Sequence, residues 1–323
     1  LAFIFVELRS VLAVGQQVVV TPEETDETAA REVALENAST QVVLRDGRIV
    51  SLLDKTRSVQ HVVAEADRDR GLFRIQLVEG VKPAGEVDAT QMTSHVRDRA
   101  SDAVEIEFEH PRVTARVRVR LSQSPGETHW SMAAEPKDGA LAVGQVTFPV
   151  VVTPRSSRGE EKRYLFPMFE GRFSPLSQPP MWRPYPAHLF AQMIACVGPA
   201  GGFLLWTDDG EGHVKAFGFT NLRSAAMFGV RHQMPYEPGR RWEMPYPTRL
   251  SLCGGAWQDA ADIYRGWATA QPWSNTPLRE RQDVPDLLRH PPLCISTQID
   301  KEDLTDLPER LAAWGKRFGV PII

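Results

Sequence analysis

Hydrophobic and polar residues alternate in short runs over most of the first 250 residues, which is the pattern of β-strands that bury one face. In the clearest run, residues 112–121, every second residue is apolar, and the residues between them are Arg112, Thr114, Arg116, Arg118 and Arg120. The apolar face of this strand is therefore expected to be core. The arginines are expected to pair with glutamates of the preceding run (Glu105, Glu107 and Glu109), and an anion-binding stripe is the alternative.

Residues 41–54 contain Asp46-Gly47 between two alternating stretches, which predicts a hairpin because glycine tolerates the positive φ of the turn. Further β-type runs are expected at residues 73–78, 103–108, 128–133, 145–150, 190–197, 203–207, 213–219, 227–232 and 248–253. Since no helical periodicity separates these runs, they predict a mainly β fold of antiparallel sheets packed as a sandwich.

The residue composition changes between residues 153 and 188, where a charged loop precedes a stretch rich in proline and aromatic residues. Proline fixes φ and removes a hydrogen-bond donor, so an ordered but irregular excursion over a sheet is predicted. Aromatic side chains in such loops can stack on sugars, which makes Trp182 a candidate substrate-binding residue.

After residue 253 the apolar period changes from two to 3.6 residues. The spacing of Trp257, Tyr264 and Trp267 predicts one helix over about residues 256–270 with a large aromatic face. Three large rings in water would form an apolar patch that monomers rarely tolerate, so this face is expected to pack between two domains.

A proline-rich linker then leads to residues 293–299, which have the composition of a buried strand. Asp306 and Pro308 stand at the start of a second predicted helix, and Gly319 stands at its C-cap. Another apolar run begins at residue 320. Strand, helix and strand in about thirty residues predict a βαβ unit and the start of a parallel sheet.

Charge and composition exclude several classes of protein. The 37 basic and 41 acidic residues give a net charge of -4 and no broad positive field, so nucleic acid is not an expected partner. No run of about 18 uncharged apolar residues exists, which argues against a membrane span. The apolar segment 1–14, which Glu7 and Arg9 interrupt, resembles the remnant of a secretion signal, with a strand as the alternative, and favours an extracytoplasmic location.

Motifs for metals and cofactors are missing from the sequence. The three cysteines, Cys196, Cys253 and Cys294, lie far apart among apolar residues and are expected to be buried thiols. The eight histidines are scattered without ligand spacing, and neither a dinucleotide-binding nor a P-loop motif is present. No metal site and no cofactor are therefore predicted.

The most suggestive cluster is WTDDGEGHVK at residues 206–215, where two predicted strands flank a turn. Asp208 and Asp209 lie in the turn, Trp206 precedes it and Lys215 follows it. Sugar recognition needs bidentate hydrogen bonds to hydroxyl groups and an aromatic ring for the apolar sugar face, so these four residues are predicted to bind substrate. The alternative is a structural turn in which an aspartate bonds its own backbone.

Parts of the chain resemble known families. Residues 35–55, LENASTQVVLRDGRIVSLLDK, resemble the start of galactose-mutarotase-like β-sandwich domains in multidomain glycosidases. The runs YPAHLFAQMIACVGPAGGFLLWTDDGEGHVKAF, GGAWQDAADIYRGWATAQPW and LRERQDVPDLL resemble a bacterial family of glycoside-hydrolase-like proteins, formerly a domain of unknown function. In that family a β-supersandwich precedes a (β/α)₈ barrel.

The resemblance implies four segments: an N-terminal segment at 1–30, a galactose mutarotase-like supersandwich at 31–254, a linking helix and linker at 255–290, and the truncated start of a TIM barrel at 291–323. It also implies carbohydrate hydrolysis by two carboxylates at barrel strand ends, which are expected beyond Ile323, so that this fragment by itself is expected to be inactive. Asp300, just past the first barrel strand, is a candidate substrate contact.

Two other functions stay open. The sandwich can be a carbohydrate-binding or barrel-supporting module without chemistry. It can also be a sugar epimerase of the mutarotase type, which needs a histidine and a carboxylate on one sheet, but the Asn-His motif of mutarotases is missing.

Overall fold

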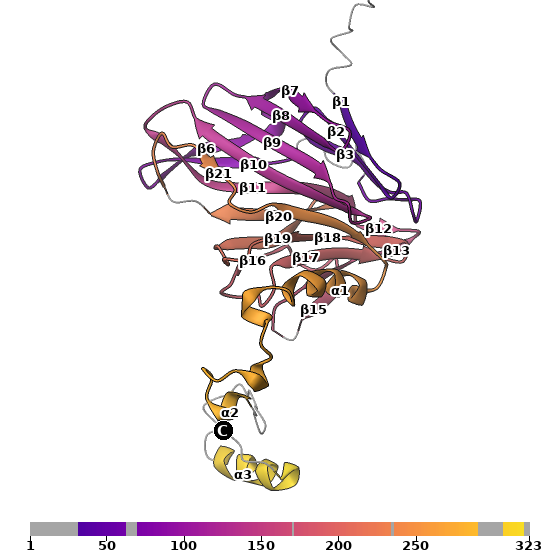
Figure 1. Cartoon of the computed structure of the whole chain (residues 1–323), viewed down its shortest axis with the longest axis vertical. Helices are drawn as coiled ribbons and strands as arrows, with labels where there is room; N and C mark the ends of the chain where they lie inside the picture. Colours follow the sequence, from indigo (N-terminus) through magenta and orange to yellow (C-terminus); the bar gives the residue numbers. More distant parts are fainter. Residues whose placement is uncertain (1–31, 63–69, 170, 234–235, 290–305, 320–323) are drawn as a thin grey trace, which may run out of the picture.

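The computed structural model describes residues 32–62, 70–169, 171–233, 236–289 and 306–319. In these ranges the chain consists mainly of strands that pair in antiparallel fashion and stack in layers (Figure 1). The predicted fold class, a mainly β sandwich of antiparallel sheets, is confirmed.

The larger sheet has ten strands among the described residues. Their order is β15 (Arg172–Pro175), β14 (Arg163–Phe166), β17 (Met193–Gly198), β18 (Gly201–Thr207), β22 (Thr248–Cys253), β10 (Glu127–Pro136), β9 (Val113–Leu121), β8 (Ala103–Glu109) and β7 (Thr93–Arg99), with β21 (Trp242–Glu243) paired to β10. The second sheet runs β16 (Met181–Tyr185), β19 (Lys215–Asn221), β20 (Ala225–Gln233), β11 (Leu141–Pro154), β5 (Arg74–Glu79) and β6 (Lys82–Asp88).

Two smaller sheets complete the described strands. One contains β1 (Glu32–Glu36), β2 (Thr40–Arg45), β3 (Arg48–Asp54) and β4 (Val59–Gln60), and the other contains β12 (Ser156–Ser157) and β13 (Glu160–Glu161). The helical elements are η2 (Ala89–Gln91), α1 (Trp257–Ala268), η3 (Pro272–Ser274), η4 (Leu278–Glu280), α2 (Asp286–Arg289) and α3 (Leu307–Phe318).

One continuous hydrophobic core includes inward-facing side chains of the three large sheets. Trp130 of β10 and Phe148 of β11 are wholly buried, and their rings lie 6.3 Å apart. Phe73, just before β5, meets Phe108 of β8 edge to face at 4.9 Å. Because such aromatic pairs combine large buried area with favourable geometry, they tie the two main sheets together.

The clearest local predictions are confirmed. Asp46 and Gly47 join β2 to β3 with φ values of 48° and 68°, so both turn residues have the positive φ that a tight hairpin requires. In β9 the residues from Val113 to Leu121 alternate between buried and more exposed, with the apolar set inside. The strand pattern therefore fixed which face of β9 is core.

The prediction of an irregular excursion between residues 153 and 188 is wrong. This stretch forms β14 and β15 at one edge of the ten-stranded sheet and β16 at one edge of the six-stranded sheet. An edge strand needs hydrogen bonds on one side only, so Pro175 and Pro184 are accommodated there despite their missing N–H groups.

Helix α1 packs on the outer face of the ten-stranded sheet, over β17, β18 and β22. Ala260 is wholly buried in this contact, and Tyr264 and Trp267 pack against it in part. Trp257, the first residue of α1, is 44% exposed and is not part of this cluster, so the prediction that the whole aromatic face is buried is wrong for this residue. Helical spacing identifies a face but does not determine how far the sheet extends beneath it.

The second predicted helix is confirmed as α3. Gly319 adopts a left-handed conformation at its C-cap, with φ of 67°, and a proline lies in its first turn. Trp314 and Phe318 are 37% and 58% exposed. The predicted barrel strand at 293–299, the run from residue 320 and segment 1–30 lie outside the described residues, so the barrel stays a prediction.

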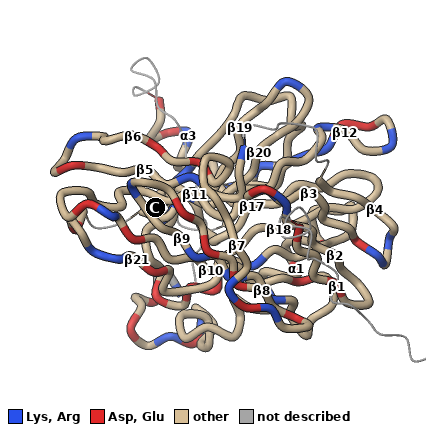
Figure 2. The backbone as a smooth tube through the Cα atoms, turned by 90° about the horizontal axis from the view of Figure 1, so that it is seen from above, with Lys and Arg blue, Asp and Glu red and all other residues tan. Residues whose placement is uncertain are grey.

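The remaining predictions concern the distribution of surface charge, the burial of the cysteines, and membrane-spanning or metal-binding segments. Basic and acidic residues are interspersed along the chain (Figure 2). Cys196 and Cys253 are free and buried, as predicted, and burial raises the pKa of both thiols to about 12; Cys294 lies outside the described residues. Within the described ranges, no helix has the length and apolarity to cross a membrane, and no group of three potential ligands could hold a metal ion.

Candidate functional site

The two adjacent acids of the predicted cluster belong to two different networks. Both directly follow β18, where successive side chains point to opposite faces of the sheet. Asp208 therefore lies on the outer face with Trp206, and Asp209 points inward. The sequence cluster is divided by the sheet rather than gathered into one site.

Asp209 bonds the backbone of its own turn, as the alternative interpretation of a structural turn predicts. Its carboxylate accepts hydrogen bonds from the backbone N–H groups of Glu211 and Gly212, both at 3.1 Å, and of His213 at 2.6 Å. Burial by itself would raise its pKa, but hydrogen bonds from Lys215 and His213 outweigh burial and lower it. The residue is 2% exposed, so the turn is held by a buried carboxylate and not by a solvated one.

Lys215 is wholly buried beside Asp209, with which it forms an ion pair. Its ammonium group also donates to Gln192 Oε1 at 2.8 Å. The same nitrogen lies 4.5 Å from the ring centroid of Tyr246 and 5.1 Å from that of Tyr185, within the range of cation–π attraction. In this conformation the charge is fully surrounded by protein groups.

Asp208 begins a second network, on the outer face of the ten-stranded sheet. It accepts a hydrogen bond from Trp267 Nε1 of α1 at 2.6 Å and pairs with Arg249. Arg249 Nη1 lies 2.7 Å from Glu127 Oε1, and His129 Nε2 lies 2.9 Å from the same oxygen. A chain of hydrogen-bonded polar groups therefore extends from helix α1 across β22 to β10.

Glu127 is the centre of this network. Burial by itself would raise its pKa, but hydrogen bonds from His129 and Arg249 outweigh burial and lower it. Ser251 also donates to it at 3.2 Å. Because three side chains hold the carboxylate, the network is pre-oriented and Glu127 stays ionised.

Two adjoining pockets lie on the same sheet face beside this network, and together we call them the sheet-face groove. The larger, of about 280 Å³, is lined by Arg118, Arg120, His129, Trp130, Ser131, Met244, Pro245, Tyr246 and Pro247. The smaller, of about 170 Å³, is lined by Glu105, Arg116, Arg118, Ser131, Met132, Ala133, Arg241, Glu243 and Met244. Polar side chains of β9 and β10 form the floor, and residues 241–247 form an apolar and charged wall.

Of the remaining predicted residues, Trp206 lies beside the network of Asp208, with the guanidinium of Arg249 4.9 Å from its ring centroid, and Trp182 lies elsewhere. The Trp206 indole is 2% exposed and packs against Trp267 at 5.4 Å, so its ring faces are covered. The Trp182 ring lies against Gly218 and close to Gly229, and the guanidinium of Arg231 lies 3.7 Å from its centroid. Asp300 lies outside the described residues. Substrate binding by the six predicted residues stays a prediction.

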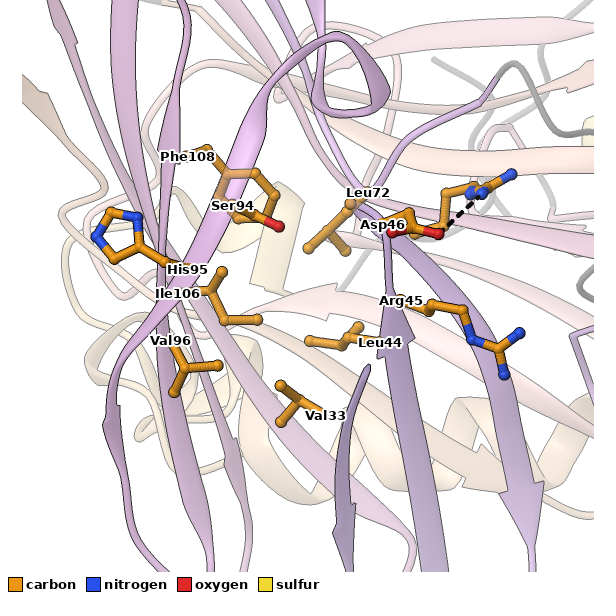
Figure 3. A pocket seen from close by; sticks show the side chains of 12 residues that line it. Val33, Leu44, Arg45, Asp46, Leu72, Ser94, His95, Val96, Ile106 and Phe108 are labelled. Carbon is orange, nitrogen blue, oxygen red and sulfur yellow. Dashed lines mark ion pairs between the residues drawn. The ribbon is translucent and has the colours of Figure 1, made fainter. Parts of the chain in front are cut away.

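A third pocket lies where the four-stranded sheet meets β7 and β8. Apolar side chains such as Val33, Leu44 and Ile106 line it together with polar ones such as Arg45 and Ser94 (Figure 3). Its volume of about 20 Å³ is comparable to the space for one water molecule, roughly 10–15 Å³ or more. This pocket is a packing defect too small for a sugar.

Sequence reasoning did not identify Glu127, His129 or Arg249. These residues come from strands about 120 positions apart, and only the register brings His129 opposite Arg249 and Arg120. A weak signal was present, because Glu127 and His129 are two positions apart and so share one face of a strand.

Comparisons with known proteins agree on the fold. No protein-family model matches the chain, and no curated protein is similar to it in sequence. A GH36 alpha-galactosidase from Geobacillus stearothermophilus superposes with a TM-score of 0.50 at 10% identity, over 79% of this chain and 43% of that protein. The chain thus spans less than half of that enzyme.

Two smaller proteins are similar over nearly their full length. A galactose mutarotase related enzyme from Lactobacillus acidophilus gives a TM-score of 0.47 at 10% identity, over 70% of this chain and 98% of that one. A putative aldose 1-epimerase from Escherichia coli K12 gives 0.49 at 9% identity, over 69% and 99%. At such identities and TM-scores, these two similarities imply nothing about activity or substrate.

Proposed function

We propose that this chain provides the β-sandwich part of a glycoside hydrolase and that its sheet-face groove binds carbohydrate. The sandwich is proposed to span residues 31–254, and helix α1 with the linker residues 255–290. A catalytic barrel is proposed to start at residue 291. The catalytic carboxylates are proposed to lie outside residues 1–323. The fold shared with the GH36 alpha-galactosidase supports this arrangement.

The observation that carries the proposal is the pre-oriented polar array next to the groove. His129 and Ser131 line its floor, and Glu127 and Arg249 hold His129 in place through a hydrogen-bonded chain. Sugar hydroxyl groups need donors and acceptors in fixed positions, because flexible partners lose entropy on binding. Beside this floor, Pro245 and Pro247 offer an apolar surface for the C–H face of a pyranose ring.

A mutarotase-type epimerase is a second candidate, favoured by one observation: His129 and Glu127 lie on one sheet face at 2.9 Å. A general base must be free to take a proton from its substrate. Glu127 instead accepts bonds from three side chains, and its lowered pKa makes it a weak base. Polarimetry on freshly dissolved glucose and galactose decides this: faster mutarotation that His129→Ala abolishes would favour the epimerase.

Binding is tested with the 323-residue chain by isothermal titration against neutral and acidic monosaccharides and oligosaccharides. His129→Ala should weaken binding of whichever sugar binds by about ten-fold, the effect of losing roughly 1.4 kcal/mol. His188→Ala is the matched control, since this exposed histidine lines neither pocket of the groove. Absence of binding to every saccharide, or equal affinity of wild type and His129→Ala, would contradict the proposal.

Glycosidase activity is tested separately with aryl glycosides. The 323-residue chain should release no phenol. Turnover that disappears with His129→Ala or Asp208→Asn would locate the catalytic site in the sandwich and overturn the proposed position of the carboxylates.

A further inference from the structure

The arginines on the outer face of β9 are not balanced by the glutamates of β8 as their spacing suggests. Arg116 pairs with Glu107 at 3.1 Å, as expected for cross-strand neighbours. Arg118 and Arg120 are exposed, and within the part of the chain that the structure describes neither has an ion pair.

Most of the nearby acids have other partners, whereas Glu105, directly opposite Arg118, has no ion pair among the residues that the structure describes. Glu107 is shared by Arg116, Arg97 and His95, and Glu109 pairs with Lys137. On the opposite side, Glu127 and Asp208 pair with Arg249, and Glu127 also pairs with His129. Apart from Glu105, these acids therefore pair with other basic side chains, and Glu127 and Asp208 share one of them, Arg249.

Strand register places both free guanidinium groups at the larger pocket. Arg118 and Arg120 are two residues apart on one face of β9, roughly 7 Å along the strand. Arg120 lies directly opposite Ala103 and His129 on the neighbouring strands, so neither of its direct cross-strand partners is an acid. Arg118 lies between Glu105 and Ser131, and Glu105 lines only the smaller pocket. Of the two free guanidinium groups, Arg120 is thus the one without a directly opposite acid.

We propose that the groove takes an acidic saccharide, a pyranose whose anionic substituent accepts hydrogen bonds from Arg118 and Arg120 while its hydroxyl groups reach His129 and Ser131. Guanidinium groups bind carboxylates and sulfate or phosphate esters through paired, charge-assisted hydrogen bonds. A pocket of about 280 Å³ is close to the lower end of ligand pockets, roughly 300 Å³, which fits one or two sugar units. This inference rests on the proposed function, because it names the substrate class of the same groove.

The test compares matched ligands by isothermal titration on the 323-residue chain. The probes are methyl glucuronide and methyl galacturonide, the neutral methyl glucoside and methyl galactoside, and the 6-sulfates of glucose and galactose. At least one anionic sugar should bind about ten-fold or more tighter than its neutral match, and this ratio should fall as salt rises from about 50 to 500 mM. The ranking of uronides and sulfates identifies the anionic group.

Two variants make the test specific. Arg118→Gln/Arg120→Gln should abolish the preference for the anionic sugar. Arg97→Gln is the matched control, because Arg97 lies on β7 of the same sheet, pairs with Glu107 and lines neither pocket of the groove. It should keep the preference within about two-fold, since a neutralised exposed charge contributes little. Thermal melting of each variant checks that it folds.

The outcomes separate the two proposals. Equal affinity for neutral and anionic sugars, with loss of both in His129→Ala, overturns the acidic preference and leaves the carbohydrate-binding groove standing. A preference that survives Arg118→Gln/Arg120→Gln also overturns this inference. If no saccharide of any kind binds, both proposals fail.

Discussion

Removing the buried carboxylate of Asp209 should destabilise the sandwich more than removing its cationic partner. The side chains of Asp209 and Lys215 are 1% and 0% exposed. Asp209→Ala removes the main anionic partner of the ammonium group, which keeps Gln192 Oε1 and the faces of two tyrosine rings. It also releases three backbone N–H groups of the 211–213 turn.

Lys215→Met has a milder expected effect. The carboxylate of Asp209 then keeps its three backbone donors and the side chain of His213, so its charge stays solvated by protein groups. Breaking a buried ion pair costs about 3–5 kcal/mol of unfolding free energy. We assign Lys215→Met the lower end, about 3 kcal/mol, and Asp209→Ala the upper end, about 5 kcal/mol.

Equilibrium unfolding in urea, followed by tryptophan fluorescence and far-UV circular dichroism, measures these differences. Glu211→Ala is the matched control, because this acid of the same turn is 86% exposed at its side chain and should change stability by less than about 0.5 kcal/mol. The double variant Asp209→Ala/Lys215→Met should be more stable than Asp209→Ala, since it removes the unpaired charge. Asp209→Ala within about 1 kcal/mol of wild type, or a double variant that shows fully additive losses, would refute the reasoning.

Further consequences can be measured in the same way. The pKa of Asp209 is lowered in the folded protein, so its ionised carboxylate stabilises the fold fully above about pH 4, the usual aspartate range. This stabilisation is lost as the pH falls through the folded pKa. The difference in unfolding free energy between wild type and Asp209→Ala should therefore narrow in acid and stay constant from about pH 5 to 7. Trp267→Ala loses the hydrogen bond to Asp208 and the contact with the sheet, so it should lower the unfolding free energy by about 3 kcal/mol. Trp257→Ala should lower it by less than about 1 kcal/mol, because Trp257 is 44% exposed. Equal losses in urea unfolding would contradict this difference. Gly47→Ala should cost about 2 kcal/mol or more, because φ is +68° and the added Cβ would lie 2.7 Å from a backbone oxygen; an unchanged melting temperature would disprove the clash.

Local chemistry determined much of the architecture from the sequence alone. The alternation in residues 113–121 identified the buried face of β9, and Asp46-Gly47 identified a turn, because side-chain period and positive φ depend on neighbouring residues only. The 3.6-residue period after residue 253 and the glycine C-cap at Gly319 likewise identified both α1 and α3. These features need no knowledge of which strands are neighbours.

Strand register was decided by the tertiary structure alone. The two-residue period indicates that Arg116 and Arg120 share one face of the strand. Only the pairing of β8, β9 and β10 places Arg116 opposite Glu107, and Arg120 opposite Ala103 and His129. The adjacent acids Asp208 and Asp209 separate for the same reason, because the sheet divides their surroundings into an outer network and a buried one. Long-range pairing brings together residues that local sequence cannot relate, and the groove beside Glu127 exists only because strands more than a hundred residues apart lie side by side.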